Sequence, residues 1–225
     1  MFTARCGVAR VVPRAEERPV RRRVPCWEFK PQAIYGQRLD PSLIEVPDGN
    51  FVFTQSTPVP GYPVELRLSS IIIAVDGACS GNGTPWPEAA VGVYVGDGSQ
   101  HNASLPLDSG YATSQKAELV AGIYGLDAAR EINKWGIGGQ SLTQVIIKTD
   151  SAYMVNGVTQ WVNRWEANGY INADGGQVTN HTLFKELTRR ICELAEAGVK
   201  VYFWHVLREH NLKADGLANL PLMRR

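Results

Sequence analysis

Ile71-Ile72-Ile73-Ala74-Val75-Asp76 is a continuous apolar run, mostly β-branched, that ends in an acid. Val145-Ile146-Ile147-Lys148-Thr149-Asp150 repeats the pattern further along the chain. Such runs are typical of central strands that are covered on both faces. If the two strands are parallel neighbours, Asp76 and Asp150 lie side by side, and their mutual repulsion requires a cation. Each aspartate alone has a plainer explanation as a turn or capping residue, which the Ser151 after Asp150 fits well.

Weaker strand and helix patterns surround these two runs. Residues 89–95 and 101–105 indicate strands joined by short turns, which predicts an antiparallel meander with the strand at 71–76. A last strand is expected at 199–206, and helices are expected at 114–132, 151–157, 159–167, 180–197 and 213–222. This order predicts an α/β fold (α+β), with a five-stranded mixed sheet flanked by helices.

The first 69 residues differ in composition from the rest. Residues 1–23 hold seven Arg against Glu16 and Glu17, and indicate a basic, disordered tail or a targeting segment for the nucleus or mitochondrion. The two acids count against a transit peptide. Residues 24–69 contain seven Pro and are expected to form an irregular N-terminal extension, either an extended arm or a short hairpin that docks through 51–53. Residues 70–225 are expected to be the functional domain.

Charge and cysteine usage narrow the classes of function. Residues 70–225 carry 13 basic and 15 acidic residues, so nucleic-acid binding would depend on local groups or metal ions rather than on overall charge. No apolar run approaches the roughly 20 residues that span a bilayer, so no membrane partner is expected. Widely spaced thiols argue against a zinc or disulfide framework and suit a reducing, intracellular compartment. These thiols are Cys6, Cys26, Cys79 and Cys192.

Two further acids stand at helix starts. Glu118 shares its helical row with Gly122, Gly125 and Ala129. A row of small residues lets a helix approach its neighbour closely, so we expect Glu118 to point toward the sheet rather than into solvent. Asp215 lies at the start of the last helix, where the helix dipole alone explains a first-turn acid.

Four segments resemble one known family in order and spacing. They are Asp76-Gly77-Ala78-Cys79-Ser80-Gly81-Asn82-Gly83, Ser114-Gln115-Lys116-Ala117-Glu118-Leu119, Thr149-Asp150-Ser151 and Asn211-Leu212-Lys213-Ala214-Asp215-Gly216-Leu217-Ala218. The chain from about 70 to 220 is similar to the type 1 ribonuclease H family. The likeness is to its eukaryotic branch, through Asn156-Gly157 and Gln160-Trp161-Val162-Asn163-Arg164-Trp165.

The resemblance implies a ribonuclease H-like fold and an endonuclease that hydrolyses the RNA strand of RNA–DNA hybrids. Asp76, Glu118, Asp150 and Asp215 would be the catalytic metal ligands. They would hold two Mg²⁺, with Mn²⁺ as an alternative, and the products would carry 5′-phosphate and 3′-hydroxyl ends. Mg²⁺ favours carboxylates, waters and substrate phosphate, which suits acids without a His or Cys cluster. The partner would be the hybrid, bound by a monomer.

The resemblance also implies a set of substrate contacts. The minor groove of the hybrid, phosphates of the DNA strand and a deoxyribose of that strand would each be contacted. For the two Trp residues the alternative is ordinary core packing. The implied set is Gly77, Cys79, Asn82, Thr113, Ser114, Gln115, Ser151, Trp161, Trp165 and Asn180.

Two departures from the family pattern leave the function open. Tyr111 stands where an Arg is usual in the phosphate pocket, and the segment 206–211 is several residues shorter than the family loop that carries a catalytic His. Aligning from Val206 places Glu209 at that position, and His210 is a candidate substitute as proton carrier. An inactive nucleic-acid-binding module and a nuclease for another nucleic acid therefore stay as alternatives.

Overall fold

A long central strand organises the sheet. In the computed structural model, which describes residues 23–36, 39–56 and 66–223, this strand is β4 (Leu66–Ser80). It pairs in parallel with β7 (Gln144–Thr149), which pairs in parallel with β8 (Lys200–His205). On its other side it pairs antiparallel with β5 (Glu88–Tyr94), which pairs with β6 (Ala103–Leu107). The mixed sheet, the antiparallel meander and the parallel neighbours expected from the two apolar runs are therefore confirmed.

The segment before residue 66 adds strands to the same sheet. β1 (Cys26–Glu28) pairs in parallel with β8, and β3 (Phe51–Gln55) pairs antiparallel with both β4 and β2 (Glu45–Asp48). Between them lie the short helix α1 (Pro31–Tyr35) and the 3-10 turn η1 (Pro41–Leu43). The sheet thus has eight strands in the described residues, where five were expected, and β4 begins four residues before the expected start of the domain.

The extra strands have a physical reason in the second face of the sheet. Phe29, Ile44 and Val52 pack there in a buried cluster with Ile72, Ile146, Trp204 and Val206. The buried Lys148 of β7 also points to this face, and its ammonium is 2.6 Å from the Glu45 carboxylate of β2. The extension therefore covers apolar residues and pairs a charge that would otherwise meet solvent or have no partner.

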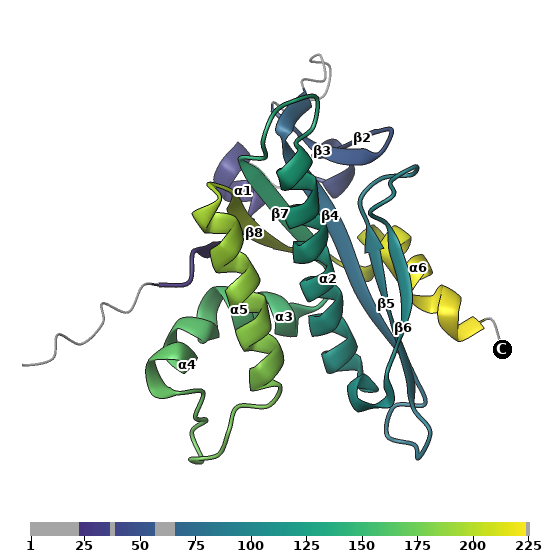
Figure 1. The fold of residues 1–225 in the computed structure, drawn as a ribbon, viewed down its shortest axis with the longest axis vertical. Coiled ribbons are helices and arrows are strands. Elements are labelled where there is room, and N and C mark those ends of the chain that lie inside the picture. The colour runs from purple at the N-terminus through teal and green to yellow at the C-terminus, as the bar shows by residue number, and fades with distance from the viewer. Residues whose placement is uncertain (1–22, 37–38, 57–65, 224–225) are drawn as a thin grey trace, which may run out of the picture.

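Helices cover the first face (Figure 1). There α2 (Ser114–Trp135) lies across β4, and α5 (His181–Glu196) packs beside α2. Between β7 and α5 come α3 (Ala152–Asn156), a π-helical turn η3 (Gly157–Trp161) and α4 (Val162–Asn168). The remaining elements are the 3-10 turns η2 (Ser109–Tyr111) and η4 (Arg208–His210), and α6 (Leu212–Met223), which packs on β5.

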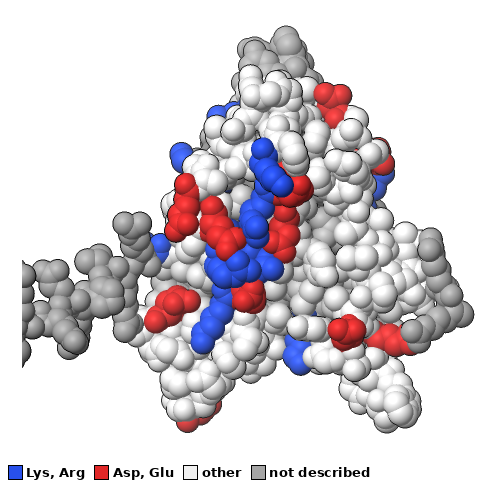
Figure 2. All heavy atoms as spheres, in the orientation of Figure 1, with Lys and Arg blue, Asp and Glu red and all other residues white. Residues whose placement is uncertain are grey.

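The outer face of α2 and α5 carries charges of both signs. Figure 2 shows basic and acidic side chains interleaved over these helices rather than a patch of one sign. Arg190 bridges Asp127 of α2 and Glu186 of its own helix. This face therefore offers no basic surface for nucleic acid. Within the described part of the chain, no helix combines the length and apolarity that crossing a bilayer requires, and the expected tail at 1–23 lies outside the described residues except for Arg23.

Candidate metal centre

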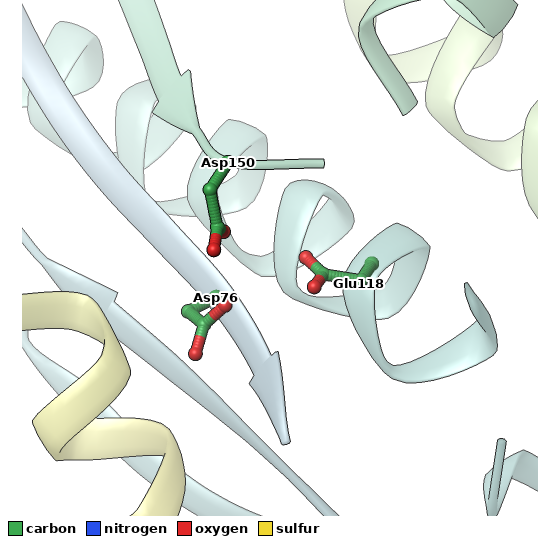
Figure 3. A group of neighbouring side chains, drawn as sticks. All are labelled: Asp76, Glu118 and Asp150. Atoms are coloured by element: carbon green, nitrogen blue, oxygen red, sulfur yellow. The ribbon is translucent and has the colours of Figure 1, made fainter. Parts of the chain in front are cut away.

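Three acids from three elements converge at the carboxyl end of the parallel strands (Figure 3). β4 and β7 are in parallel register with Ala74 opposite Lys148, so Asp76 and Asp150, two residues further along each chain, lie beside each other. Glu118 joins them from the first turns of α2. One carboxylate oxygen from each of the three lies within 4.8 Å of the others. We call Asp76, Glu118 and Asp150 the acid triad.

Close contact between α2 and β4 places Glu118. A side-chain carbon on Gly77 would lie 2.2 Å from the Ala117 carbonyl carbon and 2.2 Å from the Glu118 amide nitrogen, so only glycine fits there. Along α2, a side-chain carbon on Gly125 would lie 2.6 Å from the Val75 side chain. The row of small residues therefore does let the helix approach the sheet, and Glu118 points inward.

Burial and mutual repulsion make the charged form of the triad unfavourable. Burial, and then the charges of Asp150 and Asp215, raise the pKa of Asp76 to about 7. Burial, and then the charges of Asp76 and Asp150, raise the pKa of Glu118 to about 9, although a hydrogen bond from the Gly77 amide opposes the rise. Glu118 Oε2 is buried and has no hydrogen-bond partner among the residues that the structure describes. Buried carboxylates with an unmatched oxygen are costly unless a cation or proton joins them.

A divalent cation with a preference for oxygen fits this group. The donors are all carboxylates, which suit Mg²⁺ or Mn²⁺ and do not suit a structural Zn²⁺. The unmatched Glu118 oxygen supplies a ligand atom that no donor in the described part of the chain uses. The residues present therefore fit the metal that the sequence led us to expect.

The fourth expected acid lies next to the triad but outside it. Asp215, in the first turn of α6, forms an ion pair with Arg208, and its charge acts on Asp76. Asn211 connects this turn to the triad. Its buried side-chain amide donates to the Val75 carbonyl at 3.0 Å and to Asp150 Oδ1 at 3.4 Å, and its backbone carbonyl accepts from the Asp215 backbone amide at 3.1 Å.

The sequence-based interpretation assigned no site role to Arg208 or Asn211, although Asn211 begins one of the four family-like segments. Arg208 has position as its signal, because it lies between the last strand and the last acid and therefore returns to the same edge of the sheet. An ion pair between residues seven apart across a 3-10 turn cannot be read from spacing alone.

Seven of the ten expected substrate contacts fall in three places. Gly77 and Cys79 continue β4 past Asp76, and Asn82 is exposed in the turn that follows. Thr113 caps α2 by accepting from the Lys116 amide, and Ser114 and Gln115 are exposed in the next turn. Ser151 caps α3, directly after Asp150. These residues therefore lie on, or directly next to, the elements that carry the triad.

Trp161, Trp165 and Asn180 lie further along the chain. The two indoles are 5.6 Å apart between ring centroids, and Trp165 also contacts Phe184 and Tyr170 of the core. Trp161 is 38% exposed and lines a surface cavity of about 580 Å³ with Tyr153, Gln160 and Arg164. Trp165 packs against the core and also lines this cavity, whereas Trp161 is the more exposed of the two. The substrate role of both stays a prediction. Asn180 donates to the Tyr153 hydroxyl at 3.4 Å.

His210 faces a different environment from the triad. It is half-buried and lines a cavity of about 840 Å³ between the N-terminal extension and the turn after β8. Its nearby acid is Asp40, whose pKa is lowered first by hydrogen bonds from Ser42 and in part by His210. The structure places Arg208, not His210, against the acids, and the proton-carrier role of His210 stays a prediction.

Known proteins are similar to this chain in sequence and in fold. The family model described as RNase H matches residues 69–220, more than half of the chain. Ribonuclease H of Caulobacter sp. (strain K31) is 35% identical over 156 residues, which are 68% of this chain and 90% of that protein. Ribonuclease H1 of Homo sapiens is 32% identical over 136 residues, which are 60% of this chain but 43% of that protein, so the chain spans less than half of this relative.

A solved structure supports the fold alone. The RNase H domain of PFV superposes with a TM-score of 0.50 at 21% identity, covering 66% of this chain and 91% of that domain. The segment that the family model matches, residues 69–220, includes the acid triad, Asp215, most of β4 and all of β5 to β8. The chain belongs to the ribonuclease H family.

Proposed function

We propose that this chain is an endonuclease that hydrolyses the RNA strand of RNA–DNA hybrids with divalent metal ions, leaving 5′-phosphate and 3′-hydroxyl ends. The observation that carries the proposal is the acid triad, with its raised pKa values and unmatched Glu118 oxygen. Such a group is unfavourable in isolation and is explained by a cation that neutralises it. The ribonuclease H names of the relatives support the substrate class.

The proposed roles follow from position. Asp76, Glu118 and Asp150 would hold one cation, and Asp215 would help to hold a second. Bound there, divalent metal would supply activation of water and charge stabilisation at the scissile phosphate. Gly77 lets α2 lie close enough for Glu118 to reach the triad. Asn211 orients Asp150 through its amide. Attack by water on phosphorus breaks the bond to the 3′-oxygen, so the phosphate stays on the 5′ end of the downstream product.

We assign the substrate contacts to the surface around the triad. The 2′-hydroxyl distinguishes RNA from DNA, and Asn82, Ser114 and Gln115 are exposed polar groups on the elements that carry Asp76 and Glu118. Trp161 offers an aromatic face for a deoxyribose, since its cavity is open to solvent and Arg164 lines it too. Because the outer face of α2 and α5 is charge-balanced, it should neutralise few phosphates, so binding should be weak and only modestly dependent on salt.

The test uses four labelled substrates: RNA–DNA hybrid, double-stranded RNA, single-stranded RNA and double-stranded DNA, each with Mg²⁺, with Mn²⁺ or with chelator. We expect metal-dependent cleavage of the hybrid alone. Asp150→Asn should reduce the rate by at least about a hundredfold, because a carboxylate that binds the metal is lost. The matched control is Asp174→Asn, an exposed acid outside the site. Cleavage that persists in Asp150→Asn, or in chelator, would contradict the proposal.

A second function has one observation in its favour. Arg208 engages Asp215 directly, which suits a module that binds nucleic acid without cutting it. Hybrid binding without cleavage in either metal would support this alternative.

A further inference from the structure

Arg208 is the cation that faces the acids of this site. It belongs to η4, the 3-10 turn after β8, and its guanidinium forms an ion pair with Asp215 Oδ1. Its charge also acts on Asp76 and Asp150, and each of these acids in turn raises the pKa of the guanidinium after the direct contact with Asp215. Arg208 thus stands where positive charge is required.

The ion pair with Arg208 distinguishes Asp215 from the acid triad. The oxygens of Asp76, Glu118 and Asp150 already lie within 4.8 Å of one another, so one cation position is formed in the free protein. Asp215 is not among these three, and its carboxylate is engaged by Arg208. A second cation that needs Asp215 must therefore compete with the guanidinium for it.

A phosphate of the substrate can replace Asp215 as the partner of Arg208. The Arg208 side chain is 69% exposed, whereas that of Asp215 is 23% exposed. Exposed ion pairs contribute little to stability, so their exchange costs little. A guanidinium binds phosphate as readily as carboxylate, through the same two parallel hydrogen bonds. A phosphate of the RNA strand at this edge of the sheet would give Arg208 an equivalent partner.

We propose that Arg208 is a positioning residue that holds Asp215 in the free protein and transfers to a phosphate of the bound RNA strand, which releases Asp215 to bind the second divalent ion. The proposal rests on the proposed function. It makes hybrid binding and the second metal-binding event favour each other, because each step removes the competitor of the other. The cation of the triad would bind first and without substrate.

The experiment measures binding, not turnover, on the full chain. Manganese binding to the free protein is followed by calorimetry, and hybrid binding in chelator is followed by fluorescence anisotropy, where no cleavage occurs. Arg208→Gln is compared with wild type and with Arg189→Gln, another exposed arginine paired with acids but on the outer face of α5.

We expect Arg208→Gln to bind the second Mn²⁺ about fivefold more tightly than wild type, the factor that corresponds to about 1 kcal/mol. Its affinity for the first Mn²⁺ should rise less. In chelator its hybrid affinity should fall about fivefold to tenfold, and the slope of log affinity against log salt should be reduced by about one. Arg189→Gln should change none of these quantities. Arg208→Lys keeps the positive charge but loses the planar guanidinium with its paired donors. Its affinities for Mn²⁺ and for hybrid should lie between those of wild type and Arg208→Gln.

Other outcomes would overturn the proposal. If Arg208→Gln binds the second Mn²⁺ no more tightly than wild type, or keeps the full hybrid affinity in chelator, Arg208 does not exchange between Asp215 and phosphate. In that case wild type still cleaves hybrid, and the proposed function stands. If wild type binds neither Mn²⁺ nor hybrid, both proposals fall together. If Arg208→Gln does not fold, Arg208→Lys decides by the same two measurements.

Discussion

Glu118→Gln should stabilise the metal-free protein at pH 8. The pKa of Glu118 is about 9 in the folded protein, against an ordinary value of 4.5. At pH 8 the folded protein must therefore carry a proton that the unfolded chain releases. One pH unit corresponds to about 1.4 kcal/mol, so the 3.5 units between 4.5 and 8 set an upper limit of about 5 kcal/mol. Because neighbouring carboxyls share their protons, we expect a gain of about 2–4 kcal/mol.

The assay is thermal unfolding in chelator at pH 5 and at pH 8. A chain of this size changes its melting temperature by about 2–4 °C per kcal/mol, so Glu118→Gln should melt roughly 4–16 °C higher at pH 8. The difference should shrink at pH 5, where the proton costs less. Added Mg²⁺ should raise the melting temperature of wild type and do little for the variant. Glu131→Gln, an exposed acid on the same helix, is the control and should change stability by less than about 0.5 kcal/mol.

A lower melting temperature for Glu118→Gln than for wild type at pH 8 in chelator would contradict the prediction that Glu118 destabilises the metal-free protein. It would mean that the Glu118 carboxylate is satisfied by the protein alone. An equal response of wild type and variant to Mg²⁺ would refute it in a second way, since the metal would then bind without this acid.

Three further predictions follow from the same contacts. Metal-free wild type should lose stability as the pH rises from about 5 to about 9. The reason is that the raised carboxyl pKa values make the folded state bind more protons than the unfolded chain throughout that window. Melting temperatures in chelator that stay constant or rise with pH would argue against this. Gly77→Ala should lower stability by roughly 3 kcal/mol or more and disrupt metal binding, because the added carbon meets the α2 backbone. Gly110→Ala is the control and should be tolerated, because there is open space around Gly110. Chemical denaturation of both variants measures the difference. Glu45→Ala should lower the free energy of unfolding by about 3–5 kcal/mol, because Lys148 would stay buried without its partner. A double variant with Glu45→Leu and Lys148→Met should recover most of this stability. If the double variant does not recover it, the broken ion pair is not the cause of the loss.

The central strands were predictable because their signal is local. The apolar runs at 71–76 and 145–150 specify strands covered on both faces, and the structure confirms them as parallel neighbours that bring Asp76 beside Asp150. The inward direction of Glu118 was predictable for a similar reason, since a row of small residues lies along α2.

The N-terminal strands were not predictable from their own sequence. β1 and β2 have three and four residues, and β2 includes Pro47, so neither carries a clear alternating pattern. Their place depends on partners far away in the chain, such as the pairing of Cys26 with Val201. Lys148 inside an apolar run has the same explanation, because Glu45 lies 103 positions away.

The arrangement around the last acid depends on loop geometry. Spacing placed Asp215 at a helix start, which the structure confirms, but the contact with Arg208 arises only when η4 folds back over α6. Likewise, the sequence offered His210 as the notable residue of this segment, yet that side chain lines the cavity next to the extension.

Anomalous diffraction from crystals soaked in Mn²⁺ near pH 8 tests the metal centre most directly. We expect a manganese peak in contact with carboxylate oxygens of Asp76, Glu118 and Asp150, and the loss of that peak in Glu118→Gln crystals soaked in the same way. An ordered triad without a manganese peak, or an equal peak in the variant, would contradict this expectation.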